Sequence, residues 1–110
     1  MNHDLDLKAQ VKQILKVVQK VAPGRSVELR IPPFAAIQCV GGSTHPRGMP
    51  PNVVEMSAET LLKLLKNPVK WWKFCDSGAI SASGTNSNLS NLFVEVSKLM
   101  NSEVGSENGK

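Results

Sequence analysis

The stretch SVELRIPPFAAIQCV, Ser26 to Val40, decides the fold because it contains two strand patterns joined by a proline corner. In its first half apolar and polar residues alternate, which predicts a half-buried β-strand over residues 26–31. Pro32-Pro33 removes two backbone donors and predicts a corner or a sheet edge. Residues 34–40 are mostly apolar, which indicates a second strand in a central position.

The residues before these strands predict a long amphipathic helix over residues 4–21. Apolar side chains recur there at helical spacing on one side, and Pro23-Gly24 ends the element. Lysines repeat every fourth residue on the opposite side, at Lys8, Lys12, Lys16 and Lys20. Such a stripe is typical of a solvated face, and its alternative interpretation is a transient contact with an anionic membrane surface.

Residues 44–55, THPRGMPPNVVE, predict a constrained loop that leads into a third strand. The prolines of this segment fix φ at their own positions, and its glycine supplies a turn point between them. Residues 52–56 then resume a strand pattern. Val53 and Val54 point to opposite sides of that strand, so we expect it to be covered on both faces.

The remainder of the chain predicts further helices and one more strand. Ser57 is a good N-cap for a Leu-rich helix, and Asn67-Pro68 begins a short third helix that Gly78 ends. Residues 79–84 predict a strand of small side chains. Apolar residues at helical spacing within residues 85–100 predict the final helix.

The order of these elements predicts an α+β fold. Helices and strands are segregated along the chain, as in a small, largely antiparallel sheet packed against helices. A length of 110 residues leaves room for one hydrophobic core, which we place in a single domain over residues 1–100. Residues 101–110 are polar and rich in Gly, Ser and Asn, so a disordered tail is expected there.

The composition narrows the classes of function. The formal net charge is only +4, and the aromatic residues do not interleave with a basic run, which disfavours a nucleic-acid partner. No apolar run reaches the roughly 18 residues of a membrane span, and no secretory pattern opens the chain. We therefore expect a cytoplasmic protein with two free thiols, and we assign neither a metal nor a cofactor.

One polar group in the sequence could carry chemistry. Cys39, His45, Arg47 and Glu55 fall within a short window, and a Cys–His pair is a legitimate nucleophile–base arrangement. The structural interpretation is favoured: the cysteine is a small core residue, the histidine a loop residue, and the other two an ion pair. The chain is thus predicted not to be an enzyme, with activity through Cys39, His45 and Arg47 as the alternative.

Trp71 and Trp72 are adjacent in the predicted third helix. Neighbouring helical residues point about 100° apart, so we expect one of them in the core and the other at the rim of a cavity. A helix pair this rich in Leu, Trp and Phe, set against a strand of small residues, could enclose an apolar pocket.

Residues 59–93, ETLLKLLKNPVKWWKFCDSGAISASGTNSNLSNLF, resemble the second half of the sterol carrier protein family. With APGRSVELRIPPFAAIQC and THPRGMPPNVVE the resemblance extends over roughly residues 5–97, and the chain looks like the short bacterial orthologue branch of that family. The segment RGMPPNVVE is the most specific part. The residues of this family-motif loop are His45, Arg47, Gly48, Pro50, Pro51, Asn52 and Glu55.

The resemblance implies a sheet of about five strands covered by about four helices. It also implies non-covalent binding or carriage of a fatty acyl, sterol-like or other hydrophobic molecule in an apolar pocket. Nine residues are candidates for its lining: Phe34, Ile37, Leu61, Leu65, Trp71, Phe74, Ile80, Leu92 and Phe93. The alternative is a protein-interaction or enzyme-accessory module without a small ligand, possibly dimeric, which an exposed tryptophan in an apolar patch would favour.

Overall fold

The computed structural model describes residues 3–42 and 52–109, with side chains described over residues 5–42 and 52–101. Its elements, in chain order, are α1 (His3–Val21), β1 (Val27–Ile31), β2 (Ala35–Cys39), β3 (Asn52–Met56), α2 (Ala58–Lys66), the 3-10 turn η1 (Pro68–Lys70), α3 (Trp71–Ser77), β4 (Ile80–Ser83) and α4 (Ser90–Gly109).

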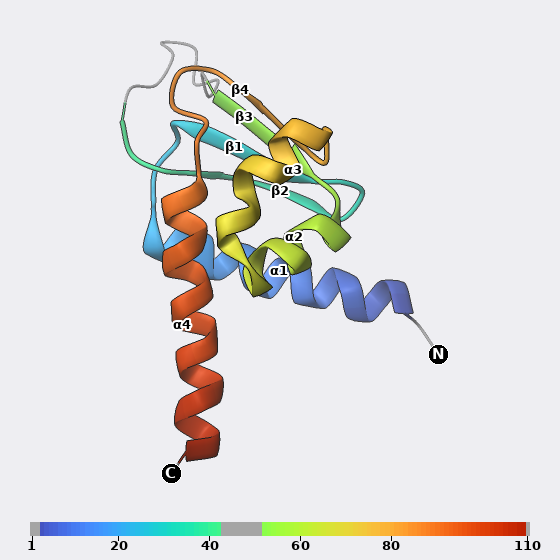
Figure 1. The fold of residues 1–110 in the computed structure, drawn as a ribbon, viewed down its shortest axis with the longest axis vertical. Helices are drawn as coiled ribbons and strands as arrows, with labels where there is room; N and C mark the ends of the chain where they lie inside the picture. Colours follow the sequence, from blue (N-terminus) through green and yellow to red (C-terminus); the bar gives the residue numbers. More distant parts are fainter. Residues whose placement is uncertain (1–2, 43–51, 110) are drawn as a thin grey trace.

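The strands of the described chain form one sheet in the order β2-β1-β3-β4 (Figure 1). The outer pairs β1–β2 and β3–β4 are antiparallel, whereas β1 and β3 run parallel, with Val27 opposite both Cys39 and Asn52. The α+β class is confirmed. Within the described residues the sheet is mixed and has four strands, rather than the roughly five expected. Strand β2 lies at the edge of the sheet rather than in its centre, because the proline corner folds it back beside β1 and β3 occupies the other side of β1.

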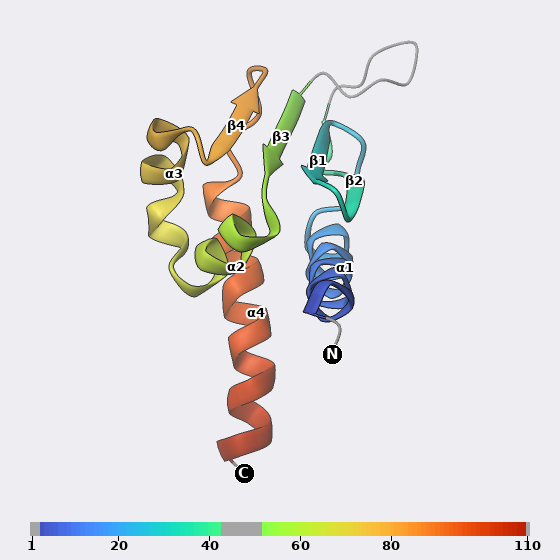
Figure 2. The same ribbon diagram turned by 90° about the vertical axis from the view of Figure 1, so that its right-hand side faces the viewer.

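The helices bury one face of this sheet (Figure 2). Leu29 and Val54 are fully buried on that face. On the opposite face the Arg30 guanidinium forms two ion pairs: its Nε lies 2.6 Å from Oε2 of Glu28, and its Nη1 lies 3.8 Å from Oε1 of Glu55. The side chains of Arg30 and Glu55 are each 47% exposed. The prediction that β3 is covered on both faces is therefore wrong: Val53 is only half-buried and Glu55 points to solvent.

Helix α1 has the amphipathic character that its sequence predicts. Val11 and Val18 are fully buried against the sheet and helices, and the four lysines of the predicted stripe are exposed. The Gln19 side-chain amide also donates to the carbonyl of Gln38 at 3.2 Å, which holds the helix against the edge strand β2. No helix in the described part of the chain is both long and apolar enough to span a bilayer.

The two adjacent tryptophans divide as predicted. Trp71 is 1% exposed and its ring stacks on Phe93 of α4, with centroids 6.3 Å apart and 24° between the planes. Trp72 is 59% exposed. The rotation of α3 that places one ring in the core therefore turns the next one outward.

Helix α4 begins later than the apolar spacing suggests, because residues 85–89 form a loop. The Ser90 N–H donates to the side chain of Asn88 at 3.0 Å, and the Phe93 N–H donates to the carbonyl of Leu89 at 3.0 Å. The helix continues to Gly109, past the predicted end of the domain (Figure 1). The division into a domain over residues 1–100 and a disordered tail over residues 101–110 stays a prediction.

Candidate functional site

The end of α1 is joined to the end of β2 through the backbone of Val40. Its N–H donates to the carbonyl of Ala22 at 2.7 Å, and its carbonyl accepts the N–H of Ser26 at 2.9 Å. Val40 has a left-handed φ of 66°. A Cβ on Gly24 would lie 2.2 Å from the Val40 carbonyl oxygen, so this close crossing of two backbones requires glycine.

Asn52 joins three segments at the same end of the sheet. Its side-chain amide donates to the backbone carbonyl of Ser26 at 2.9 Å and to the Ser26 hydroxyl at 3.3 Å. Its side-chain oxygen accepts the N–H of Asn86 at 2.9 Å. Asn52 is only 2% exposed, so its bonds to Ser26 are made away from water, and the bond from Asn86 is partly buried. This residue of the family-motif loop therefore holds the loop after β4 in place.

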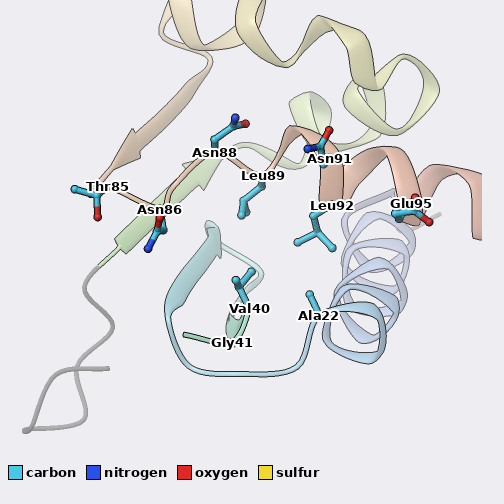
Figure 3. Close-up of a pocket in the computed structure, with 10 residues that line it drawn as sticks. All are labelled: Ala22, Val40, Gly41, Thr85, Asn86, Asn88, Leu89, Asn91, Leu92 and Glu95. Atoms are coloured by element: carbon cyan, nitrogen blue, oxygen red, sulfur yellow. The ribbon is translucent and has the colours of Figure 1, made fainter. Parts of the chain in front are cut away.

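A cleft of about 640 Å³ lies beside this junction, between the end of α1, the end of β2 and the start of α4. Figure 3 shows Leu89 and Leu92 on one side of the cleft, with Val40 and Ala22 across from them. Three asparagines and Thr85 line the remainder, and Glu95 is the one ionisable residue among the described residues that line it. We call it the Asn cleft. The polar groups that these described residues contribute are neutral or anionic, which disfavours an anionic guest.

A second cleft of about 560 Å³ lies between three helices, and we call it the α1–α2–α4 groove. Ile14, Leu62, Leu65 and Met100 supply its apolar surface, and amide side chains of α1 and α4 lie beside them. Among the described residues that line it, Lys66 is the one ionisable side chain. A cavity of this size, with an apolar surface and a few polar groups, has the character of a small-molecule site.

The α1–α2–α4 groove is held together by a hydrogen bond between two of its helices. The Ser97 hydroxyl of α4 donates to the carbonyl of Leu65, near the end of α2, at 2.7 Å. Ser97 is 7% exposed, so this bond is largely shielded from solvent. It fixes the side of the groove that Leu65 and Met100 form.

Two further clefts are smaller. One of about 280 Å³ lies between α3 and β4 and is lined in part by both tryptophans, which places Trp72 at a rim as predicted. The other, of about 350 Å³, lies at the proline corner beside Arg30 and Glu55.

The nine predicted lining residues are spread over the core and these clefts. Leu61 and Phe93 are fully buried in the core, and Ile37 and Phe74 are half-buried beside it. Trp71 and Ile80 line the cleft between α3 and β4, and Phe34 lines the cleft at the proline corner. Leu65 lines the α1–α2–α4 groove, and Leu92 lines the Asn cleft. Their role as ligand contacts stays a prediction. Ile14, Leu62 and Met100 were missed as lining residues, although each belongs to a helical apolar pattern.

The alternative function, activity through Cys39, His45 and Arg47, requires Cys39 as an accessible nucleophile. Cys39 is fully buried, and burial raises the pKa of its thiol to about 11, so it is a neutral thiol near pH 7. Glu55 lies 3.8 Å from the guanidinium of Arg30 on the neighbouring strand, and its expected ion pair with Arg47 falls outside the described residues. Five residues of the family-motif loop lie outside the described residues: His45, Arg47, Gly48, Pro50 and Pro51. Within the described residues no group of three or more His, Cys, Asp or Glu side chains could hold a metal ion.

Comparison with models of known protein families identifies the family of the chain. The model of the family described as "Bacterial SCP ortholog" matches residues 4–94. The chain belongs to the sterol carrier protein family. The match includes the strands, the Leu-rich helix and the start of α4, so the resemblance drawn from the sequence is confirmed. Membership of this family suggests a lipid-binding carrier role in general. A comparison with curated proteins finds no match.

Proposed function

We propose that this protein binds and carries a hydrophobic, lipid-like ligand without covalent chemistry, and that the ligand lies in the α1–α2–α4 groove. The observation that carries the proposal is the composition of that groove, in which four large apolar side chains lie beside one lysine. Membership of the sterol carrier protein family supports the same class of ligand. The proposed setting is the cytoplasm, where free thiols such as Cys39 and Cys75 stay reduced.

The groove favours an amphipathic guest with an apolar chain and an anionic head. Ile14, Leu62, Leu65 and Met100 can cover an alkyl chain, and the exposed ammonium of Lys66 can pair with a carboxylate at the rim. The Asn cleft is comparable in volume, but the one ionisable side chain among its described lining residues is the carboxylate of Glu95. The two clefts are similar in volume, and the charge of their described lining residues distinguishes the α1–α2–α4 groove from the Asn cleft.

The first test is native mass spectrometry of the freshly purified protein, followed by organic extraction of whatever is released. A co-purifying acyl or isoprenoid species at near one-to-one stoichiometry would support the carrier function and give its ligand class. A protein that stays ligand-free after incubation with mixed lipids would contradict it.

The groove itself is tested with a fluorescent fatty acid and a matched pair of variants. Leu65 lines the α1–α2–α4 groove, Leu92 lines the Asn cleft, and both are half-buried. Leu65→Gln should weaken binding at least tenfold, whereas Leu92→Gln should leave it within twofold of the parent. The reverse order would move the ligand to the Asn cleft.

A series of fatty acids provides an independent check of chain burial. Each buried methylene contributes roughly 0.8 kcal/mol, so affinity should rise about fourfold per carbon until the groove is filled. Lys66→Gln should weaken the binding of a fatty acid more than that of the corresponding alcohol, because only the acid carries a charge. An affinity that is independent of chain length would argue against an apolar site.

The alternative function, a protein-interaction or enzyme-accessory module, rests on the 59% exposure of Trp72. The native mass spectrum addresses it directly. A dimer or hetero-complex without a released small molecule would favour the module over the carrier.

A further inference from the structure

Two hydrophobic side chains lie exposed close together where η1 joins α3. Val69 is 79% exposed and Trp72 is 59% exposed. The turn η1 ends at Lys70 and α3 follows at once with Trp71 in the right-handed helical conformation, so Val69 and Trp72, three residues apart, lie on the same side. Lys70 and Lys73 adjoin them in the chain and are exposed as well. We call these four residues the Trp72 patch.

The position of the Trp72 patch is fixed by the core. Trp71 is buried against Phe93, and this contact sets the rotation of α3 about its own axis. Trp72 follows by about 100° and cannot turn inward without withdrawing Trp71. Its ring borders the cleft between α3 and β4 yet leaves most of its surface in solvent. The exposed indole is therefore a stable feature of the fold.

The charge around the Trp72 patch is positive. From Lys66 to Phe74 the chain carries three lysines and no acidic residue, and the first carboxylate after them is that of Asp76. The neighbouring strand β4, ISAS, contributes no charge. Exposed lysines beside a partly exposed indole complement the surface of a lipid bilayer, which has anionic head groups outside and an apolar interior.

We propose that the Trp72 patch docks the protein on the surface of a bilayer containing anionic phospholipids. Trp72 would lie at head-group depth with Val69 beside it, while Lys70 and Lys73 would contact lipid phosphates. A bilayer fits better than a protein partner, because lysine is depleted from the cores of protein interfaces. The lysine stripe of α1 has four lysines where the Trp72 patch has two, but it has no Trp, Phe or Tyr beside them.

Docking at this place would also bring one end of the α1–α2–α4 groove toward the lipid. Lys66 lines that groove, and only Asn67 and Pro68 separate it from Val69. The docking proposal stands on exposure and charge alone. It does not require that the groove hold a ligand.

The test is cosedimentation of the full chain with vesicles of phosphatidylcholine, with and without phosphatidylglycerol. The parent protein should bind only the anionic vesicles. Trp72→Ser should weaken that binding at least tenfold, and Lys70→Gln with Lys73→Gln by about thirtyfold, from the loss of two charges near the surface. These residues are exposed, so circular dichroism and the thermal midpoint should remain those of the parent.

Two matched controls test whether binding depends on the Trp72 patch itself or on any exposed apolar or positively charged side chain. Leu5 is as exposed as Trp72, at 59%, and Leu5→Ser should leave vesicle binding unchanged. Lys12→Gln with Lys16→Gln removes the same charge from α1 and should weaken binding less than threefold. If the α1 variant loses binding and the Lys70/Lys73 variant retains it, the docking surface is α1 and the proposal is wrong.

Two other results would overturn the proposal. A parent protein that does not bind anionic vesicles would do so directly, as would a dimer that Trp72→Ser dissociates, since the patch would then be a contact between copies of the chain. Fatty-acid binding in solution, measured on Trp72→Ser, keeps the two proposals apart. It should be unchanged, because Trp72 does not line the α1–α2–α4 groove.

Discussion

The backbone N–H of Asn86 donates to the side-chain oxygen of Asn52 at 2.9 Å, across 34 positions of the sequence. The same asparagine holds the backbone of Ser26, just before β1. One buried side chain thus fixes the start of β3, the entry to β1 and the loop that leads to α4. The contact therefore holds Asn86, which lines the Asn cleft.

Asn52→Ala should therefore destabilise the protein by about 2 kcal/mol, because it leaves a buried carbonyl and a backbone N–H without partners. Urea denaturation measures the loss. Asn91→Ala is the matched control: Asn91 is exposed and lines the Asn cleft, so the change should stay within about 0.5 kcal/mol of the parent. If Asn52→Ala also stayed within about 0.5 kcal/mol of the parent, the Asn52 bonds would contribute no net stability.

Gly24 and Gly78 should respond differently to alanine, although both have positive φ, at 145° and 86°. Gly24→Ala places a Cβ 2.2 Å from the Val40 carbonyl oxygen and should cost about 3 kcal/mol or more, since backbone must move. Gly78→Ala meets nothing within 4 Å and should cost only about 1 kcal/mol, from the left-handed φ. Chemical denaturation of both variants checks this, and a milder effect at Gly24 than at Gly78 would contradict the described crossing with Val40.

Trp71 and Trp72 should separate stability from surface effects. Trp71→Ala removes a buried ring stacked on Phe93 and should destabilise by about 3–5 kcal/mol. Trp72→Ala removes a ring that is 59% exposed and should change the unfolding free energy by less than about 1 kcal/mol. Thermal and urea unfolding measure both. A large loss from Trp72→Ala would show that its contacts in the cleft between α3 and β4 are more important than its exposure indicates.

Cys39 should make stability depend on pH in the alkaline range. Its folded-state pKa of about 11 lies above the ordinary value of about 9, so its neutral thiol favours the folded state below pH 9. This contribution decreases as pH rises from 9 to 11 and amounts to a loss of about 1 kcal/mol at pH 10. Unfolding free energies of the parent and Cys39→Ala should therefore converge as the pH rises. Parallel profiles would contradict the raised pKa.

The two thiols should also differ in their reaction with iodoacetamide. Cys75 is half-buried and should be labelled in the native protein, slowly, because burial and the charge of Asp76 raise the pKa of its thiol. Cys39 is fully buried and should react only after unfolding. Mass spectrometry of digests before and after addition of urea measures both. Native labelling of Cys39 would reopen the alternative of cysteine chemistry.

Local patterns in the sequence predicted most elements because their causes are local. The apolar repeat of α1, the alternation in β1 and the rotation between Trp71 and Trp72 each follow from backbone periodicity alone. The order of strands does not. Val27 pairs with Cys39 through a short corner and with Asn52 through a much longer connection, and only packing of the whole chain selects the second partner.

The candidate site was less predictable than the fold. The nine proposed lining residues are apolar, and apolarity alone does not distinguish a filled core position such as Phe93 from the edge of a cleft such as Leu65. That distinction depends on where helices diverge. Asn52 did leave a signal, since it is a polar residue on the same strand face as Val54 and Met56, where a buried side chain must find partners.

The parallel pairing of β1 with β3 joins two halves of the fold, each formed by a continuous stretch of the sequence. One half contributes α1, β1 and β2, and the other contributes β3, β4 and the remaining helices. In the helical layer the two halves meet where α1 packs against α4. Each half keeps its own antiparallel pair. A chain cut between residues 42 and 52 would accordingly yield two complementary pieces, in which the newly exposed strand edges, β1 in one piece and β3 in the other, are partners for each other.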